Sequence, residues 1–294
     1  MPIRLDNGPV GVKIVADKTI SRYRADWRLA GARMVSSPTE FASPASVPLR
    51  AHLGPLRGLD LKARYHSSRT GGDFFDVLSV GCHVVFLLTD IAGEWGEARG
   101  LAVEMQETFR RRVPELLGSP DRNVAEEVAK LTHEINLRLI QAAHGVHYAP
   151  TFLGCYDVTL GILTYVNAGG QTAVFRDREG TRVLGNISIP LGLFTHLTYE
   201  PAVQVFEPGA RLMVVTKGIL ESRRGRSLFG VERVTRLLRS WKTDSADEIC
   251  QAMVRAAHGF KGPSWYSLLH LHFGRQGVVE DMTALALVRP LDEA

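Results

Sequence analysis

The spacing of hydrophobic and polar positions changes along the chain and predicts where strands and helices lie. Residues 59–65 alternate between apolar and polar side chains, which is typical of a half-buried strand. Two strongly apolar segments follow at residues 74–80 and 82–89, and Gly81 between them favours a β-hairpin.

Helical spacing appears next. Residues 96–117 carry apolar side chains three and four positions apart, and the sequence Gly118-Ser119-Pro120 ends the pattern. A second amphipathic helix is predicted at residues 123–143. Its apolar face consists of Val124, Val128, Leu131, Ile135 and Leu139.

The remainder of the chain alternates between short strands and helices. Further strands are predicted near residues 152–156, 161–167, 172–176, 203–206, 211–216 and 283–289, and helices near 230–239 and 246–257. Strands outnumber the helices that could connect parallel neighbours, so the pattern indicates an α+β fold in which helices flank an antiparallel β-sandwich. Residues 1–50 are polar and broken by glycine and proline, and we interpret them as an N-terminal arm and linker before one domain at 51–290.

Composition adds expectations about location. The 294 residues are 45% hydrophobic and 22% charged, and no apolar run approaches the roughly 18 residues of a membrane span. The N-terminal sequence shows no apolar stretch of an export signal. Cys82, Cys155 and Cys250 are far apart in the sequence and form no CxxC pair, so we expect reduced thiols and a cytoplasmic location. We expect no contact with a membrane. An oligomer is possible.

The basic residues do not suggest a nucleic-acid-binding surface. The formal charge is only +4, and the clusters at residues 110–112 and 223–226 are interpreted as a solvated helix face or loop. His144 and His147, which have no acidic or cysteine partner nearby, are likewise expected to be solvated residues at a helix end rather than metal ligands.

Two aspartates at strand ends are the candidates for chemistry. Asp73 begins one strand of the predicted hairpin and Asp90 ends the other, so both carboxylates fall at the same end. Paired carboxylates beside glycines make a hard oxygen site suited to Mg²⁺ or Mn²⁺. Aspartates that merely cap turns are the alternative from spacing alone.

A series of short motifs carries a family resemblance. The first three are Ala63-Arg64-Tyr65, Gly71-Gly72-Asp73-Phe74-Phe75-Asp76-Val77 and Asp90-Ile91-Ala92-Gly93. Further ones follow in order: Tyr165-Val166-Asn167-Ala168-Gly169, Pro190-Leu191-Gly192, Glu207-Pro208-Gly209, the segment from Leu212 to Glu221, Phe229-Gly230 and Glu280-Asp281-Met282-Thr283. Together they resemble the PPM family of metal-dependent protein phosphatases, and most of all the bacterial sporulation and stress-response branch that acts on sigma-factor regulators.

The resemblance implies roles for particular residues. Asp73 would bind the second of two Mn²⁺ or Mg²⁺ ions, Asp90 would bridge both, and the Ile91 carbonyl would contribute to the second. Asp76 matches an acidic position with at most an auxiliary role. Family members hydrolyse phosphoserine or phosphothreonine with metal-activated water, so the implied partner is a phosphorylated regulatory protein, such as an anti-sigma-factor antagonist.

The first metal site departs from the family pattern. Where the family has two aspartates, this chain has Lys217 and Glu280, although Asp281 could compensate for Glu280 by a small backbone shift. The Lys217 side chain could swing away, or its ammonium could take the place of a metal ion and pair with Asp90 and Glu280; we expect the second. The centre would then hold one ion or none.

Two loops also differ from the family. The loop at residues 93–96 is one residue longer than usual and contains Trp95, and Gly170 stands where a histidine is familiar. Two functional hypotheses therefore remain open. The chain is either a serine/threonine protein phosphatase with a degraded first metal site, or an inactive pseudophosphatase that acts as a binding or regulatory module.

Overall fold

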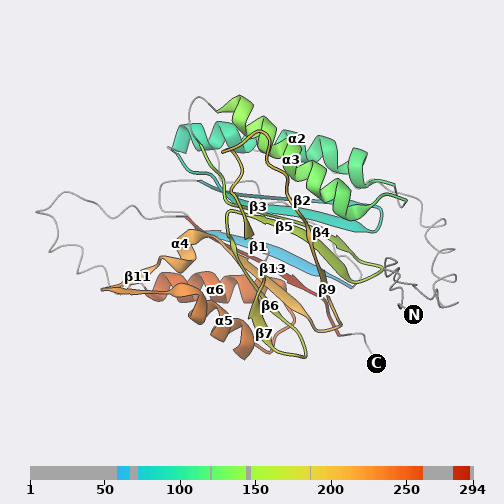
Figure 1. Ribbon diagram of the computed structural model, residues 1–294. Helices are drawn as coiled ribbons and strands as arrows, with labels where there is room; N and C mark the ends of the chain where they lie inside the picture. The colour runs from blue at the N-terminus through green and yellow to red at the C-terminus, as the bar shows by residue number, and fades with distance from the viewer. Residues whose placement is uncertain are drawn as a thin grey trace, which may run out of the picture. The chain divides into compact units, whose positions relative to one another are not determined.

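Two β-sheets lie face to face in the computed structural model, and helices cover the outer face of each sheet (Figure 1). The structure describes residues 58–66, 72–93, 95–119, 121–143, 147–185, 187–260 and 281–291, all within one unit that spans Glu40–Ala294. The predicted arm at residues 1–50 lies outside the described residues. The predicted α+β class, an antiparallel sandwich flanked by helices, is confirmed.

The first sheet contains the predicted hairpin and has the strand order β2-β3-β4-β5-β8, with β9 also paired to β5. All its pairings are antiparallel except that of β5 with β8. Its strands are β2 (Asp73–Val80), β3 (His83–Asp90), β4 (Thr151–Asp157), β5 (Ile162–Ala168), β8 (Ile187–Ser188) and β9 (Ala202–Val205).

The second sheet is antiparallel throughout and joins strands that lie far apart in the sequence. Its order is β1-β13-β10-β6-β7, so the first and last strands of the described chain are neighbours. The strands are β1 (Asp60–His66), β13 (Met282–Val288), β10 (Arg211–Val215), β6 (Thr172–Arg176) and β7 (Thr181–Val183).

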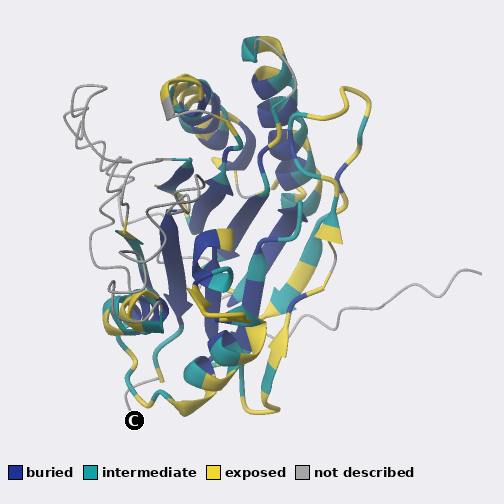
Figure 2. Cartoon of the chain, turned by 90° about the vertical axis from the view of Figure 1, so that its left-hand side faces the viewer, coloured by how far each residue is buried: buried dark blue, intermediate teal, exposed yellow. Residues whose placement is uncertain are grey.

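Strand β3 shows why the central strands are almost entirely apolar. Val84, Phe86 and Leu88 point into the core between the two sheets, whereas Val85 and Leu87 point toward the helices on the outer face. Alternate residues of a strand face opposite sides, so a strand covered on both sides has no position left for solvent. Figure 2 shows this distribution, with buried strands inside and exposed residues on the outer helix faces.

Helices α2 (Trp95–Leu117) and α3 (Val124–Ala142) cover the first sheet. The Asn123 side chain accepts hydrogen bonds from the amides of Ala125 and Glu126 and so begins α3. The predicted apolar face of α3 is buried at Val128, Leu131, Ile135 and Leu139, while Val124 is only partly buried.

Helices α5 (Gly230–Ser240) and α6 (Ala246–Phe260) cover the second sheet together with the single turn α4 (Lys217–Leu220). The sequence pattern did not predict α4, strands β7 and β8, or the small hairpin of β11 (Arg223–Arg224) and β12 (Ser227–Leu228). These elements are two to four residues long, too short for hydrophobic periodicity to mark them. None of the described helices combines the length and apolar character needed to cross a membrane.

One basic cluster differs from its interpretation as a solvated surface. Asp76 is fully buried on β2, and its carboxylate accepts hydrogen bonds from the guanidinium of Arg110 on α2 at 2.7 and 3.0 Å. Gln106 donates a further hydrogen bond of 3.0 Å to the same carboxylate. Arg110 therefore compensates a buried charge, and only residues 223–226 form the expected exposed loop.

The Asp76–Arg110 pair yields a stability prediction. Arg110→Met leaves the Asp76 carboxylate buried without its cation, and losing one partner of a buried ion pair costs about 3 kcal/mol or more. Urea denaturation is expected to show this loss in the free energy of unfolding. The neighbouring Arg111 is exposed, so Arg111→Met should change stability by less than about 0.5 kcal/mol. Equal effects of the two substitutions would contradict the assignment.

Candidate metal centre

The hairpin places the two predicted aspartates opposite each other. Asp73 and Asp90 are register partners at the open end of β2 and β3, and the turn at the other end contains Gly81 with φ of +58°. Directly paired residues of antiparallel strands have Cα atoms about 4.5–5.5 Å apart. The expectation that both carboxylates lie at the same end of the hairpin is confirmed.

Gly72 allows a close approach of the backbone beside these carboxylates. The Ile91 amide donates a 2.9 Å hydrogen bond to the Gly72 carbonyl. A Cβ at position 72 would lie 2.7 Å from the Ile91 carbonyl oxygen and 3.4 Å from Oδ1 of Asp90. A side chain at this position would therefore displace the carbonyl that the family resemblance implies as a ligand.

Two threonines from the opposite sheet hold Asp73. Oδ2 of Asp73 accepts hydrogen bonds from the hydroxyls of Thr216 at 2.7 Å and Thr283 at 2.6 Å. The Thr283 amide donates in turn to the Thr216 hydroxyl at 3.0 Å. These bonds fix the Asp73 carboxylate against β13 and the residue that follows β10, so both sheets contribute to the site.

The Asp73 carboxylate is in an unfavourable electrostatic environment. Its residue is 3% exposed, and burial raises the pKa of Asp73 well above its ordinary value. The nearby charges of Asp90 and Asp281 raise it further, while the two threonine hydroxyls lower it. A cation bound among these acidic groups would relieve their repulsion.

Asp281 provides an independent sign of a cation. It is 5% exposed, and within the described part of the chain neither of its carboxylate oxygens has a hydrogen-bond partner. Buried carboxylates without donors are costly and usually pair with a cation. Asp281 therefore remains a candidate ligand, whereas Glu280 lies outside the described residues.

Lys217 lies beside the same centre. It is the first residue of α4 and lines a cavity of about 140 Å³ with Asp90, Pro150, Gly169, Gly170, Gln171 and Leu220. Its Nζ lies 3.7 Å from Oε2 of Glu221, and its side chain is 58% exposed. The structure thus brings Lys217 to the cavity of Asp90, and the expectation that its ammonium replaces a metal ion stays a prediction.

The residues that are present suit a hydrated divalent cation at the second metal position. Asp73, Asp90 and the Ile91 carbonyl offer only oxygen donors, which Mg²⁺ and Mn²⁺ prefer. Mg²⁺ keeps several water ligands and needs only one or two carboxylates. The family resemblance implies a carboxylate at the position of Lys217 in the first site, and the expectation that the centre holds fewer than two ions stays a prediction.

His147 was assigned wrongly as a solvated residue. Its side chain is 12% exposed, and its Nδ1 lies 3.1 Å from the Ala92 carbonyl in the loop that follows Asp90. His147 therefore supports that loop, a contact that links distant segments and leaves no local sequence signal. His144 lies outside the described residues.

Thr216 and Thr283 were also missed as parts of the site. Both lie inside motifs that the family resemblance was based on, but threonine is common in strands and its spacing carries no chemical signal. For Thr216, the one local hint was its position directly after the apolar strand β10 and before Lys217.

A sandwich of two sheets between helices, with carboxylates at the open end of its central hairpin, defines the class of metal-dependent PPM-type phosphatase domains. The family model "Stage II sporulation protein E (SpoIIE)" matches residues 81–289, which is more than half of the chain. The chain therefore belongs to the SpoIIE family, whose enzymes are metal-dependent.

Individual proteins resemble this chain in sequence or in fold. The chain is 24% identical over 157 residues to the phosphoserine phosphatase RsbP of Bacillus subtilis, covering 53% of this chain and 38% of RsbP. The RsbU and RsbW domains of Rv1364c from Mycobacterium tuberculosis align with a TM-score of 0.60 and 20% identity, over 81% of this chain and 63% of that one. The phosphatase and partial regulatory domains of SpoIIE from Bacillus subtilis align with a TM-score of 0.61 and 12% identity, over 82% and 64%. The chain thus spans less than two thirds of each relative.

The strained carboxylate predicts a gain of stability when its charge is removed. Because the pKa of Asp73 is raised in the folded protein, its charged form opposes folding at any pH above the ordinary value of about 3.9. With divalent cations chelated, Asp73→Asn is expected to raise the free energy of unfolding at pH 7–8 by about 0.5–2 kcal/mol. The gain should shrink as the pH falls toward about 4 and vanish below it, where the carboxyl is protonated in both the folded and the unfolded state.

Denaturant titrations at several pH values check this expectation. Asp76→Asn is the matched control on the same strand, and it should instead lose stability because Asp76 is paired with Arg110. A loss of stability for Asp73→Asn at pH 7 in the presence of chelator would show that the Asp73 charge is compensated within the protein.

Proposed function

We propose that this domain recognises a phosphoserine or phosphothreonine segment of a regulatory protein, and that Lys217 prevents efficient turnover. The observation that carries the proposal is the position of Lys217, which lines the same small cavity as Asp90. The domain would then act as a pseudophosphatase, a binding or regulatory module with a degraded first metal site. Residues 51–290 would form this domain, and residues 1–50 an arm.

The retained half of the centre suits phosphate recognition. Asp73, Asp90 and the Ile91 carbonyl are the groups that would hold one Mn²⁺ or Mg²⁺ ion. Such an ion supplies positive charge for a phosphoryl group and acidifies a water molecule when it is bound. The Thr216 and Thr283 hydroxyls keep the Asp73 carboxylate oriented without a metal, so the protein would hold this half of the site ready.

The altered first metal position argues against rapid hydrolysis. Replacing a carboxylate by the Lys217 ammonium changes the local charge by two units. One pair of unit charges about 4 Å apart interacts by roughly 4 kcal/mol at an effective dielectric constant of 20. Even after discounting for the exposed Lys217 side chain, this opposes binding of a second dication next to Asp90.

An active phosphatase is the second candidate. It is favoured by the carboxylate of Asp281, which has no hydrogen-bond partner among the described residues and could replace a first-site ligand. It is also favoured by the ion pair of Lys217 with Glu221, which draws the ammonium toward the far end of α4. In that case the enzyme would be a Mn²⁺- or Mg²⁺-dependent protein serine/threonine phosphatase.

The partner class follows from the family. Its relatives include a protein named as a phosphoserine phosphatase and one in which RsbU and RsbW domains occur in one structure. We therefore infer a cytoplasmic role in signal transduction, with a phosphorylated regulator of the anti-sigma-factor antagonist type as the partner.

Restoring the family carboxylates tests the proposal. Lys217→Asp combined with Glu280→Asp is expected to raise Mn²⁺-dependent phosphate release from a phosphoserine peptide by about 100-fold or more, since about 1.4 kcal/mol corresponds to a factor of ten in rate. Lys130→Asp, an exposed substitution on α3, makes a single charge reversal of the same kind as Lys217→Asp and should change nothing.

The wild type should meanwhile bind the same phosphopeptide, as measured by fluorescence anisotropy. A wild type that hydrolyses the peptide as fast as the double variant would refute the pseudophosphatase and establish the active enzyme. If neither protein hydrolyses or binds the peptide, both candidates fail.

A further inference from the structure

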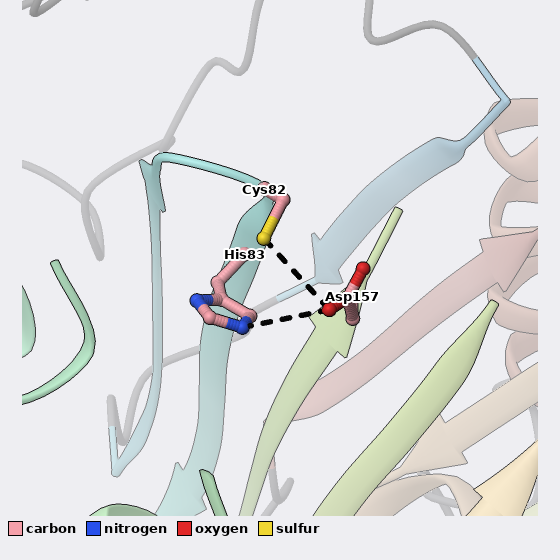
Figure 3. Close-up of side chains that lie close together, drawn as sticks. All are labelled: Cys82, His83 and Asp157. Carbon is pink, nitrogen blue, oxygen red and sulfur yellow. Dashed lines mark hydrogen bonds and ion pairs between the residues drawn. The ribbon is translucent and has the colours of Figure 1, made fainter. Parts of the chain in front are cut away.

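A second group of potential ligands lies at the opposite end of the hairpin from Asp73 and Asp90. Cys82, His83 and Asp157 point toward one another there (Figure 3). Each of these residues offers one possible ligand atom, and the three atoms all lie within 4.8 Å of one another. Among the described residues, no other three His, Cys, Asp or Glu side chains meet this condition. None of the three residues belongs to the PPM motifs or to the proposed phosphate site.

Two turns of the first sheet position these side chains. Cys82 follows Gly81 in the turn between β2 and β3, and His83 begins β3 directly opposite Asp157, the last residue of β4. The Val158 amide donates a 2.9 Å hydrogen bond to the Cys82 carbonyl. The backbone therefore holds the three side chains on paired elements rather than on a free loop.

The distances between ligand atoms are close to those of a metal site. Oδ2 of Asp157 lies 3.8 Å from Sγ of Cys82 and 3.7 Å from Nε2 of His83. Around a tetrahedral Zn²⁺ with ordinary bond lengths, such atoms are about 3.3–3.6 Å apart. A contraction of a few tenths of an ångström would bring these two pairs to that spacing, and the Cys82 and His83 ligand atoms, which lie within 4.8 Å of each other, would also have to approach.

The imidazole is oriented as metal-binding histidines usually are. Nδ1 of His83 lies 3.1 Å from the Leu117 carbonyl at the end of α2. A carbonyl only accepts hydrogen bonds, so Nδ1 carries the hydrogen and Nε2 faces the Asp157 carboxylate. The lone pair of a neutral imidazole would thus confront a carboxylate oxygen, and this arrangement calls for a cation between them, either a proton or a metal ion.

The carboxylate is oriented in the same way. Oδ1 of Asp157 accepts hydrogen bonds from the amides of Thr159 at 2.8 Å and Leu160 at 2.9 Å. These bonds leave Oδ2 directed at Cys82 and His83. His83 and Asp157 therefore each have a hydrogen-bond partner on the atom that would not bind the metal, and such partners fix the orientation of ligands in metal sites.

Burial and charge favour a soft divalent cation. The side chains of His83 and Asp157 are 6% and 15% exposed, and Cys82 is partly buried. Burial, and next the charge of Asp157, raise the pKa of the Cys82 thiol, so a metal ion would have to displace the thiol proton to solvent. The resulting thiolate and carboxylate would neutralise a dication, and thiolate with imidazole selects Zn²⁺ over Mg²⁺ or Mn²⁺.

We propose that Cys82, His83 Nε2 and Asp157 Oδ2 bind one Zn²⁺ ion, with water as the fourth ligand. The ion would join the β2–β3 turn to the end of β4 and, through His83 and Leu117, to the end of α2. It would stabilise the end of the first sheet that is remote from the phosphate site, independently of the Mn²⁺ or Mg²⁺ centre.

Cobalt serves as a spectroscopic probe of this site. The full chain, without an affinity tag, is stripped with chelator under reducing conditions and titrated with Co²⁺. One equivalent is expected to produce the near-ultraviolet absorption of a thiolate–cobalt bond, and Zn²⁺ should abolish it by competition. At a Zn²⁺ concentration 100 times the dissociation constant, the unfolding equilibrium constant should fall about 100-fold, seen as a rise in Tm.

Three variants decide the assignment. Cys82→Ser and Asp157→Asn should each weaken Zn²⁺ binding at least tenfold and reduce the Tm rise, with circular dichroism used to check that both proteins are folded. Asp90→Asn, in the other centre, should keep the thiolate band and the Tm rise. The proposal fails if the wild type shows no thiolate band, if the band survives in Cys82→Ser, or if Zn²⁺ stabilises Asp157→Asn as much as the wild type. It also fails if Asp90→Asn alone abolishes Zn²⁺ binding.

Discussion

The register of the β2–β3 hairpin is the constraint on which the rest of the molecule depends. It sets Asp73 opposite Asp90 at one end and, through β3 and β4, His83 opposite Asp157 at the other. A shift of one strand by one residue would turn all of its side chains to the opposite face. Because both faces of β3 are buried, the packed core itself resists such a shift. Hydrophobic packing therefore fixes the positions of acidic groups that repel each other.

The two buried aspartates of β2 show how the fold tolerates this repulsion. Asp76 faces the helices, where Arg110 and Gln106 compensate its charge, so it contributes to stability. Asp73 faces the gap between the sheets, where, among the described residues, the hydroxyls of Thr216 and Thr283 donate to its Oδ2 and Asp90 and Asp281 add negative charge. A residue that weakens the folded state at neutral pH is expected at a binding site, because the ligand supplies the missing compensation.

The sequence allowed an element to be predicted wherever its hydrophobic pattern extended over many residues, as in α3 and the β2–β3 hairpin. It also placed Asp73 and Asp90 at one end of that hairpin, since their positions follow from strand pairing alone. It did not reveal Thr216, Thr283 or His147, because each acts through a contact between segments distant in the sequence. Arg110 was misinterpreted for the same reason: its partner Asp76 is 34 positions away. Local patterns specify secondary structure, whereas the environment of a side chain depends on tertiary packing.

Because Thr216 directly precedes Lys217 in the chain, the fold can be kept while the chemistry of residue 217 changes. Thr216 precedes α4, but its hydroxyl does not cap that helix; it donates to Asp73 and accepts from the Thr283 amide instead. The backbone that carries residue 217 is therefore held by the Asp73 network itself, whatever side chain residue 217 bears. A change from carboxylate to ammonium at this position alters the charge of the Asp90 cavity while the strands, threonines and core stay as they are. Family membership depends on that preserved framework, whereas the proposed loss of turnover depends on the single side chain at residue 217.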